Sequence, residues 1–236
     1  MNVSAGAVTG SPWAFGALQP FSYNLVMVDV PTETKMRSEK GERKSPQAQY
    51  GCMSIEKAAT FPVGNLIKGS GVLFLWWTWP RLLYGGDIAL RFKDHKASRS
   101  EAGELIDAWG ARYVTGGSWF KRTKHGKPAF GPGYRIRTTC EPFLLAIFGN
   151  PNTREGRRMR NIIESIEENA FDGLRREHSR KPEEAYAWCE RYMPGARYAE
   201  LFSRRSRPLW DTWGYEAGKF DPVVSLNAAP AKEAAA

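Results

Sequence analysis

Cysteine and histidine are scarce in this sequence, and each shortage excludes a class of site. Three cysteines and three histidines occur among 236 residues. Cys52, Cys140 and Cys189 lie far apart and form no C-x-x-C pair, which excludes a dense disulfide scaffold and a compact zinc finger and fits a reducing cytosol. No histidine has another histidine or a cysteine at the spacing of metal ligands, so the sequence predicts no metal site.

Long apolar runs and several catalytic signatures are also missing. The longest near-continuous apolar stretch, 72–79, has eight residues, whereas a membrane-spanning helix needs about 20. Residues 1–9 lack the charged-then-apolar layout of a secretory signal. We therefore expect a cytoplasmic protein with no membrane partner. No G-x-S-x-G nucleophile elbow, Walker phosphate loop or G-x-G-x-x-G fingerprint occurs.

Apolar and basic residues, by contrast, are plentiful. Hydrophobic residues make up 42% and aromatic residues 13% of the chain, which is enough for a substantial core. Lys and Arg number 34 against 25 Asp and Glu, and the net charge of +9 favours polyanionic partners, nucleic acid first. We expect one domain over residues 14–220, a flexible amino-terminal tail at 1–13 and a low-complexity, alanine-rich tail at 221–236.

Apolar runs alternate with helical patterns inside that domain. The expected strands are 25–28, 72–77, 113–120, 143–148 and 198–203, and the expected helices are 98–109 and 182–193. In the first helix, Ser98 and Glu101 have the spacing of a capping box, and Gly110 marks the end. The alternation predicts an α/β sandwich with a largely parallel sheet. Ligands in such folds bind beyond the carboxyl ends of the strands, which directs attention to 29–32 and 204–207.

A basic cluster lies in a segment rich in glycine and proline, with aromatic residues interleaved. Its basic residues are Lys121, Arg122, Lys124 and Lys127, and Tyr134 is one of its aromatic residues. This mixture suits a phosphate backbone together with an unstacked base. The alternative is a set of solvated loops on an ordinary basic protein.

The segment Asp29-Val30-Pro31-Thr32 follows the first expected strand. Amino-group methyltransferases place an acidic or amide side chain and prolyl backbone carbonyls at such a strand end. These groups accept hydrogen bonds from the exocyclic amine of a base, and an aromatic residue at the fourth position stacks on that base. Asp29 and Pro31 match the pattern, whereas Val30 and Thr32 replace a proline and an aromatic residue. Taken alone, D-x-P-T also fits an ordinary strand that ends in a turn.

The rest of the chain carries a family resemblance, in colinear order over roughly residues 17–217. The matching stretches are LQPFSYNLVMVDVP (18–31), SEKGERKSPQAQYGCM (38–53), FPVGNL (61–66), LFLWWTWP (73–80), GSWFKRTKHGKPAFGPGYRIR (117–137), EPFLLAIFGNP (141–151), REHSRKPEEAY (176–186) and ELFSRRSRPLWDTWG (200–214). The sequence resembles the adenine N6-methyltransferase family that contains eukaryotic mRNA adenosine methyltransferases and many phage and bacterial DNA adenine methyltransferases. The short phage and prophage members show the nearest pattern.

This resemblance implies a Rossmann-like S-adenosylmethionine-dependent methyltransferase fold with its motifs in permuted order. The catalytic strand end comes early in the chain, and much of the S-adenosylmethionine pocket comes late. Two late blocks, R-E-H-S-x-K-P and E-L-F-x-R-x-x-R-P, are matched here. With Asp29, the residues that the resemblance assigns to the cofactor are His178, Ser179, Lys181, Glu200, Arg204 and Arg207. The alternative for the late residues is a salt-bridged surface loop.

The function that the resemblance implies is N6-adenine methylation of DNA in a bacterial or phage-infected cell. The catalytic segment would be Asp29 to Thr32, the target a flipped or single-stranded adenine, and no metal would be used. The loop 121–134 matches a segment expected to contact the nucleic acid.

Three departures from the family pattern leave other interpretations open. Besides Asp-Val-Pro-Thr, a W-x-T-N-P segment has Trp79 in place of its asparagine, and a W-G-N-E segment has Tyr215 in place of its asparagine. A second hypothesis is therefore a catalytically degenerate member that binds nucleic acid or scaffolds an active partner. A third is modification of a different base. DNA against RNA, and a homodimer or heterodimer against a monomer, also stay open.

Overall fold

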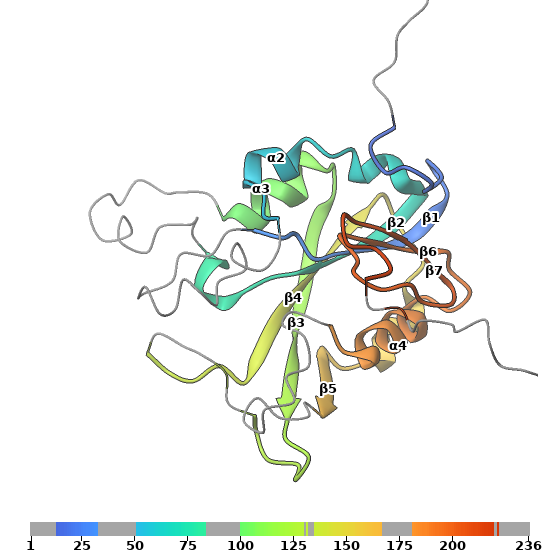
Figure 1. Cartoon of the computed structure of the whole chain (residues 1–236). Helices are drawn as coiled ribbons and strands as arrows, with labels where there is room; N and C mark the ends of the chain where they lie inside the picture. Colours follow the sequence, from blue (N-terminus) through green and yellow to red (C-terminus); the bar gives the residue numbers. More distant parts are fainter. Residues whose placement is uncertain are drawn as a thin grey trace, which may run out of the picture.

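A seven-stranded sheet forms the centre of the computed structural model, in the order β5-β3-β4-β2-β1-β6-β7 (Figure 1). The structure describes residues 13–32, 51–83, 100–129, 131, 135–166, 181–219 and 221. The tails expected at 1–13 and 221–236 lie outside these residues except for their innermost positions. The strands are β1 (Tyr23–Val28), β2 (Ile67–Trp76), β3 (Arg112–Arg122), β4 (Cys140–Phe148), β5 (Ile162–Ile166), β6 (Tyr198–Leu201) and β7 (Trp210–Trp213).

Four of the six strand pairings are parallel, which confirms the predicted α/β class and the largely parallel sheet. β4 is the exception, because it runs antiparallel to both of its neighbours, β2 and β3. The amino end of β4 therefore lies at the same edge of the sheet as the carboxyl ends of the other strands. This places Glu141 on the edge where ligands bind in α/β folds.

The two faces of the sheet bury separate apolar layers. Val26 and Val28 of β1 belong to one layer, and Leu25 and Met27 belong to the other. Successive side chains of a strand point to opposite faces, so a strand covered on both sides is apolar at consecutive positions. This explains why β1 and β2 were recognisable as strands from the sequence.

Helices α2 (Ile55–Ala59) and α3 (Glu101–Ala108) cover one face together (Figure 1). α3 begins after Ser100, whose hydroxyl accepts a hydrogen bond from the Gly103 amide at 3.3 Å. The N-cap is therefore Ser100 and not the predicted Ser98, which lies outside the described residues, and the Glu101 carboxylate accepts a hydrogen bond from Arg81. Gly110, with a φ of +78°, ends the helix as predicted.

Helix α4 (Glu183–Tyr192) covers the opposite face, with Ala185, Trp188 and Cys189 buried against the sheet. Its bounds agree with the helix predicted at 182–193. The last predicted strand, 198–203, ends earlier, at Leu201, because Phe202 has a φ of +62° and turns the chain. Among the described residues, no helix combines the length and apolarity needed to cross a membrane.

Candidate active site at the carboxyl edge of the sheet

Asp29 follows β1 at the carboxyl edge, where it meets two charged residues from other elements. Its Oδ2 lies 3.3 Å from the Nζ of Lys181, in the segment that leads into α4. The same ammonium lies 3.1 Å from Oε2 of Glu141, the second residue of β4. It also sits 4.9 Å from the ring centroid of Trp76, and the Lys181 side chain is only 10% exposed. Three segments far apart in the sequence thus build one charge cluster around a nearly buried ammonium group.

The Lys181 ammonium and the Glu141 carboxylate favour each other's ionised form. Burial alone would lower the pKa of Lys181, but the Asp29 and Glu141 carboxylates outweigh it and raise that pKa. Burial alone would raise the pKa of Glu141, but the ammonium groups of Lys181 and Lys121 lower it to about 2. Burial raises the pKa of Asp29, and Lys181 opposes this shift. The result is a hydrogen-bond acceptor, Asp29, whose orientation is fixed by a neighbouring cation.

The backbone after Asp29 is held by hydrogen bonds to the carbonyl oxygens of Val30 and Pro31. The Thr32 amide donates to the Val30 carbonyl, and the Met53 amide donates to the Pro31 carbonyl, each at 2.8 Å. Val30 packs into the core with 8% of its surface exposed, so this segment is rigid without the usual first proline. A carbonyl oxygen has two lone pairs, so each can still accept one further hydrogen bond.

Arg81, which the sequence analysis did not single out, connects Thr32 to Glu101 at the start of α3. The guanidinium of Arg81 donates to the Thr32 hydroxyl oxygen, and its Nε donates to Oε2 of Glu101 at 2.7 Å. Both Arg81 and Glu101 are 9% exposed. Position 32 is therefore a hydrogen-bonded polar wall in place of a stacking ring.

Glu200, in β6, is the acidic residue of the neighbouring strand end. It is 6% exposed and accepts hydrogen bonds from the hydroxyls of Tyr186 and Ser203, both at 2.9 Å. Burial raises the pKa of Glu200 to about 7, although both hydroxyls oppose the shift. This carboxyl therefore changes its protonation state near neutral pH.

An arginine-rich loop follows β6 and closes the other side of the site. Arg205 contacts Oε1 of Glu183 at 2.6 Å, and Arg207 pairs with Oε2 of the same residue. Arg204 lies 2.7 Å from Glu216, the acidic residue of the W-G-Y-E segment. The predicted cofactor residues that line one pocket are Asp29, Lys181, Glu200, Arg204 and Arg207. The structure brings these five residues together and also pairs the arginines with carboxylates, and their assignment to the cofactor stays a prediction.

Residues 23–216 match the family model described as MT-A70. The chain belongs to the MT-A70 family. It is similar to a protein of Arabidopsis thaliana named N(6)-adenosine-methyltransferase MT-A70-like, with 27% identity over 78% of this chain and 22% of that protein. MT-A70-like proteins of Medicago truncatula and Oryza sativa subsp. japonica are 26% and 25% identical, each over 77% of this chain. The chain spans about a fifth to a quarter of the length of these relatives.

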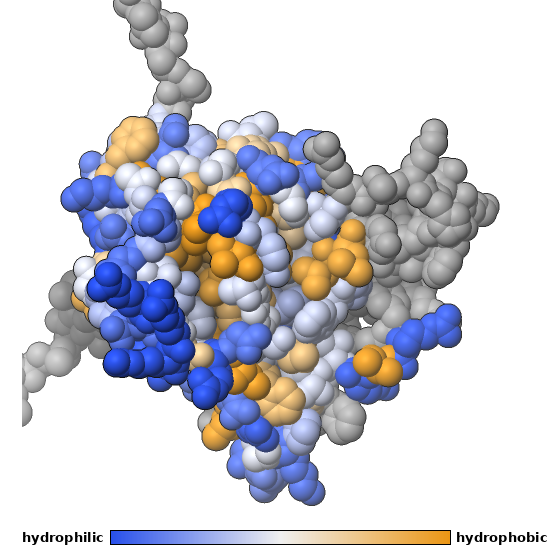
Figure 2. Space-filling model, turned by 180° about the vertical axis from the view of Figure 1, so that it is seen from behind, coloured by the Kyte–Doolittle hydropathy of each residue, from blue (hydrophilic) through white to orange (hydrophobic). Residues whose placement is uncertain are grey.

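The basic segment of this MT-A70 chain divides into two parts. Lys121 and Arg122, at the end of β3, are engaged with Glu141 and Glu164 respectively. The other predicted lysines, 124 and 127, are exposed in the turn that follows. That turn is the lower tip of the molecule in Figure 1, and Figure 2 shows strongly hydrophilic side chains gathered there. Of the other predicted site residues, Tyr134, His178 and Ser179 lie outside the described residues.

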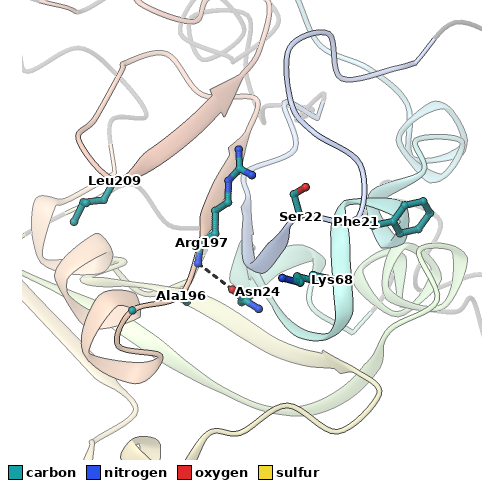
Figure 3. Close-up of a pocket in the computed structure, with 8 residues that line it drawn as sticks. Phe21, Ser22, Asn24, Lys68, Ala196, Arg197 and Leu209 are labelled. Atoms are coloured by element: carbon teal, nitrogen blue, oxygen red, sulfur yellow. Dashed lines mark hydrogen bonds between the residues drawn. The ribbon is translucent and has the colours of Figure 1, made fainter.

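The larger hollow of the described structure lies at the opposite edge of the sheet. It has a volume of about 560 Å³ and is bordered by Ser22, Asn24 and Arg197, among others (Figure 3). The Arg197 amide donates to the Asn24 side chain at 3.0 Å. These residues precede or begin β1 and β6, whereas Asp29 and Glu200 lie at the other ends of those strands. The hollow is therefore separate from the edge that carries Asp29 and Glu200, despite its size.

Sequence reasoning missed the residues that orient the predicted ones. Glu141 opens the E-P-F-L-L block, and a charged residue at the start of an apolar strand was the available signal. Arg81 and Glu101 carried no signal, because their pairing joins a turn after β2 to the first turn of α3. Within the described ranges, no three His, Cys, Asp or Glu side chains cluster as metal ligands.

Proposed function

We propose that this chain is an S-adenosylmethionine-dependent adenine N6-methyltransferase that acts on DNA. The observation that carries the proposal is the Asp29 carboxylate, which lies at a strand end with 30% of its side chain exposed and is held by Lys181 beside the Glu200 pocket. The family supports it, since the relatives are named as N(6)-adenosine-methyltransferase-like proteins. The net charge of +9 and the exposed lysines beyond β3 support a nucleic-acid substrate.

The donor set of the pocket fits S-adenosylmethionine. That molecule carries a carboxylate, an ammonium group and a ribose diol, and the pocket offers both cations and hydrogen-bond acceptors. Lys181 and Arg207 would face its carboxylate end, and Glu200 would accept hydrogen bonds from its hydroxyls. When bound, it supplies an electrophilic methyl group on a sulfonium.

The chain's own residues would bind and orient the amine of the target adenine. Asp29 accepts a hydrogen bond from an amine N–H, and the backbone carbonyl of Val30 or Pro31 accepts the other. These two acceptors fix the direction of the nitrogen, so the chemical step gains chiefly from positioning. Asp29 is also the nearest base for the proton that the amine must lose, and its raised pKa suits that role. Lys181 is a positioning residue, because it holds the carboxylate in place.

The test is incubation of the chain with methyl-labelled S-adenosylmethionine and unmodified DNA, followed by nucleoside mass spectrometry. Single-stranded DNA, duplex DNA and RNA should be compared in parallel. We expect N6-methyldeoxyadenosine, and we expect Asp29→Ala to abolish it. Asp107→Ala is the matched control, because Asp107 is an exposed residue of α3 away from the site. Labelled N6-methyladenosine in RNA alone would correct the substrate, and no labelled nucleoside would contradict the proposal.

A second candidate function is nucleic-acid binding or scaffolding by a degenerate family member. Two observations favour it: Thr32 bears no ring, and Glu183 already holds two of the pocket arginines. Calorimetry discriminates the two candidates. A competent enzyme should bind S-adenosylmethionine or its demethylated product with a micromolar dissociation constant, roughly −8 kcal/mol. No binding at millimolar ligand would favour the scaffold.

A further inference from the structure

Trp79 is an exposed aromatic residue held at the edge that carries Asp29. It begins the short helical turn η3 (Trp79–Arg81), which follows β2 after two residues. The residue is 46% exposed, yet its indole N–H donates to the Cys140 carbonyl at 3.0 Å. A large apolar ring is thus kept near solvent in a fixed position.

The neighbours of Trp79 connect it to both sides of the catalytic edge. On one side, Cys140 directly precedes Glu141, which holds Lys181 and through it Asp29. On the other side, Arg81 at the end of the same turn donates to the Thr32 hydroxyl. β2 is also the direct neighbour of β1 in the sheet. The Trp79 ring therefore belongs to a segment with contacts on two sides: Cys140, next to the Glu141 that holds Lys181 and Asp29, and Thr32, through Arg81.

A base taken out of its stack needs an apolar face to lie against, and position 32 does not supply one. Enzymes that act on an extruded base place it between aromatic or apolar side chains. The two other tryptophans of this segment, Trp76 and Trp77, are 1% and 6% exposed and belong to the core. Among residues 77–81, all of which the structure describes, Trp79 is the only one with an exposed aromatic ring.

We propose that Trp79 is the stacking platform for the target base, and that it takes over the role that an aromatic residue at position 32 would fill. The inference deepens the proposed function and rests on it. The ring is already held by its hydrogen bond to Cys140, and the turn that carries it is held by the Arg81–Glu101 pair. Little rotational freedom is then lost when a base stacks on it.

The test compares Trp79→Ala, Trp79→Phe and Leu83→Ala with the unaltered chain. Stacking of one base is worth roughly 1–3 kcal/mol, so Trp79→Ala should lower kcat/KM for methylation by about fivefold to somewhat over a hundredfold. Trp79→Phe keeps a ring but loses the indole N–H, and it should retain most of the activity. Leu83, 69% exposed just beyond the turn, is the control for loss of exposed apolar surface.

A binding measurement gives a readout that does not depend on catalysis. The probe is a single-stranded oligothymidine that contains one 2-aminopurine, whose fluorescence falls when it stacks on an aromatic ring. We expect quenching with the unaltered chain and with Trp79→Phe, and little with Trp79→Ala. Thr32→Trp should restore both quenching and activity in the Trp79→Ala chain, because it returns a ring to position 32.

The outcomes separate this inference from the proposed function. If the unaltered chain methylates adenine and Trp79→Ala changes neither activity nor quenching, the inference is wrong and the function stands. If Trp79→Phe loses as much as Trp79→Ala, the indole serves only to cap Cys140, and the inference is again wrong. If no methylation occurs but quenching depends on Trp79, the platform exists and the catalytic proposal fails. No methylation and no quenching would overturn both.

Discussion

Asp29 and Arg207 line the same pocket, but their partners belong to different kinds of structure. Asp29 is held by Lys181, which is 10% exposed and also contacts Glu141 from β4. Arg207 is paired with Glu183, whose side chain is 50% exposed at the start of α4, and lies 3.5 Å from the less exposed Glu190. The Asp29–Lys181–Glu141 cluster is held in place by residues next to or within the strands. The pairing of Arg207 with Glu183 involves a solvated carboxylate, which a ligand anion can replace. The comparison teaches that one half of the site is preformed and the other half is exchangeable.

The largest expected effect comes from removing the shared cation of the preformed half. Lys181→Met leaves the Asp29 and Glu141 carboxylates without it. The loss of one partner in a fully buried charge pair costs about 3–5 kcal/mol, and we expect the lower end of that range because the two carboxylates are 30% and 26% exposed. Urea denaturation at neutral pH should show a loss of this size, and methylation should be abolished. Lys127→Met, on the exposed turn, is the control. A loss below about 1 kcal/mol would mean that the cluster is not locked.

Glu200 should make stability depend on pH. Its pKa is raised from 4.5 to about 7 in the folded chain, so the folded state binds the proton more tightly than the unfolded state. The resulting stabilisation is complete below about pH 4.5 and is lost as the pH rises to about 7, by about 3 kcal/mol. The free energy of unfolding, measured by urea titration across this range, should fall less in Glu200→Gln. Identical pH profiles would contradict the shift.

Two substitutions sharpen the comparison on the exchangeable side. Arg207→Ala should weaken S-adenosylmethionine binding by about 1–3 kcal/mol, the cost of a lost charged hydrogen bond. Glu183→Gln should act in the opposite direction, because it releases Arg205 and leaves Arg207 with Glu190 as its remaining carboxylate partner. Calorimetry with the same ligand measures both. If Glu183→Gln weakens binding instead, Glu183 orients the arginines and does not compete for them.

The smallest effect is expected at the basic turn beyond β3. Neutralising Lys124 and Lys127 removes up to two phosphate contacts, so the slope of log affinity against log salt should become shallower by up to about 1.8 for duplex DNA. Neutralising Lys121 and Arg122 should change the slope less, because both are engaged with carboxylates. Equal slope changes for the two pairs would show that those ion pairs open when nucleic acid binds.

The elements that the sequence predicted well are those whose pattern is local. β1 and β2 are apolar at consecutive positions, and α4 begins directly after Pro182 and buries one face. Helix α2 and the strands β5 and β7 were not predicted. They are only four or five residues long. In β5 the exposed positions include Ile162 and Ile166, whereas Ser165 is buried, so the sequence of this strand does not alternate between apolar and polar residues.

The sequence by itself determined the α/β class, the family and the strand end that carries Asp29, because apolar periodicity and the motif blocks are local patterns of neighbouring residues. Only the tertiary structure decided which residues orient Asp29 and Thr32. Glu141 reaches Lys181 because β4 runs antiparallel to its neighbours, and Arg81 reaches Thr32 across 49 positions of sequence. Pairings between distant segments depend on strand direction and register, which no local pattern encodes.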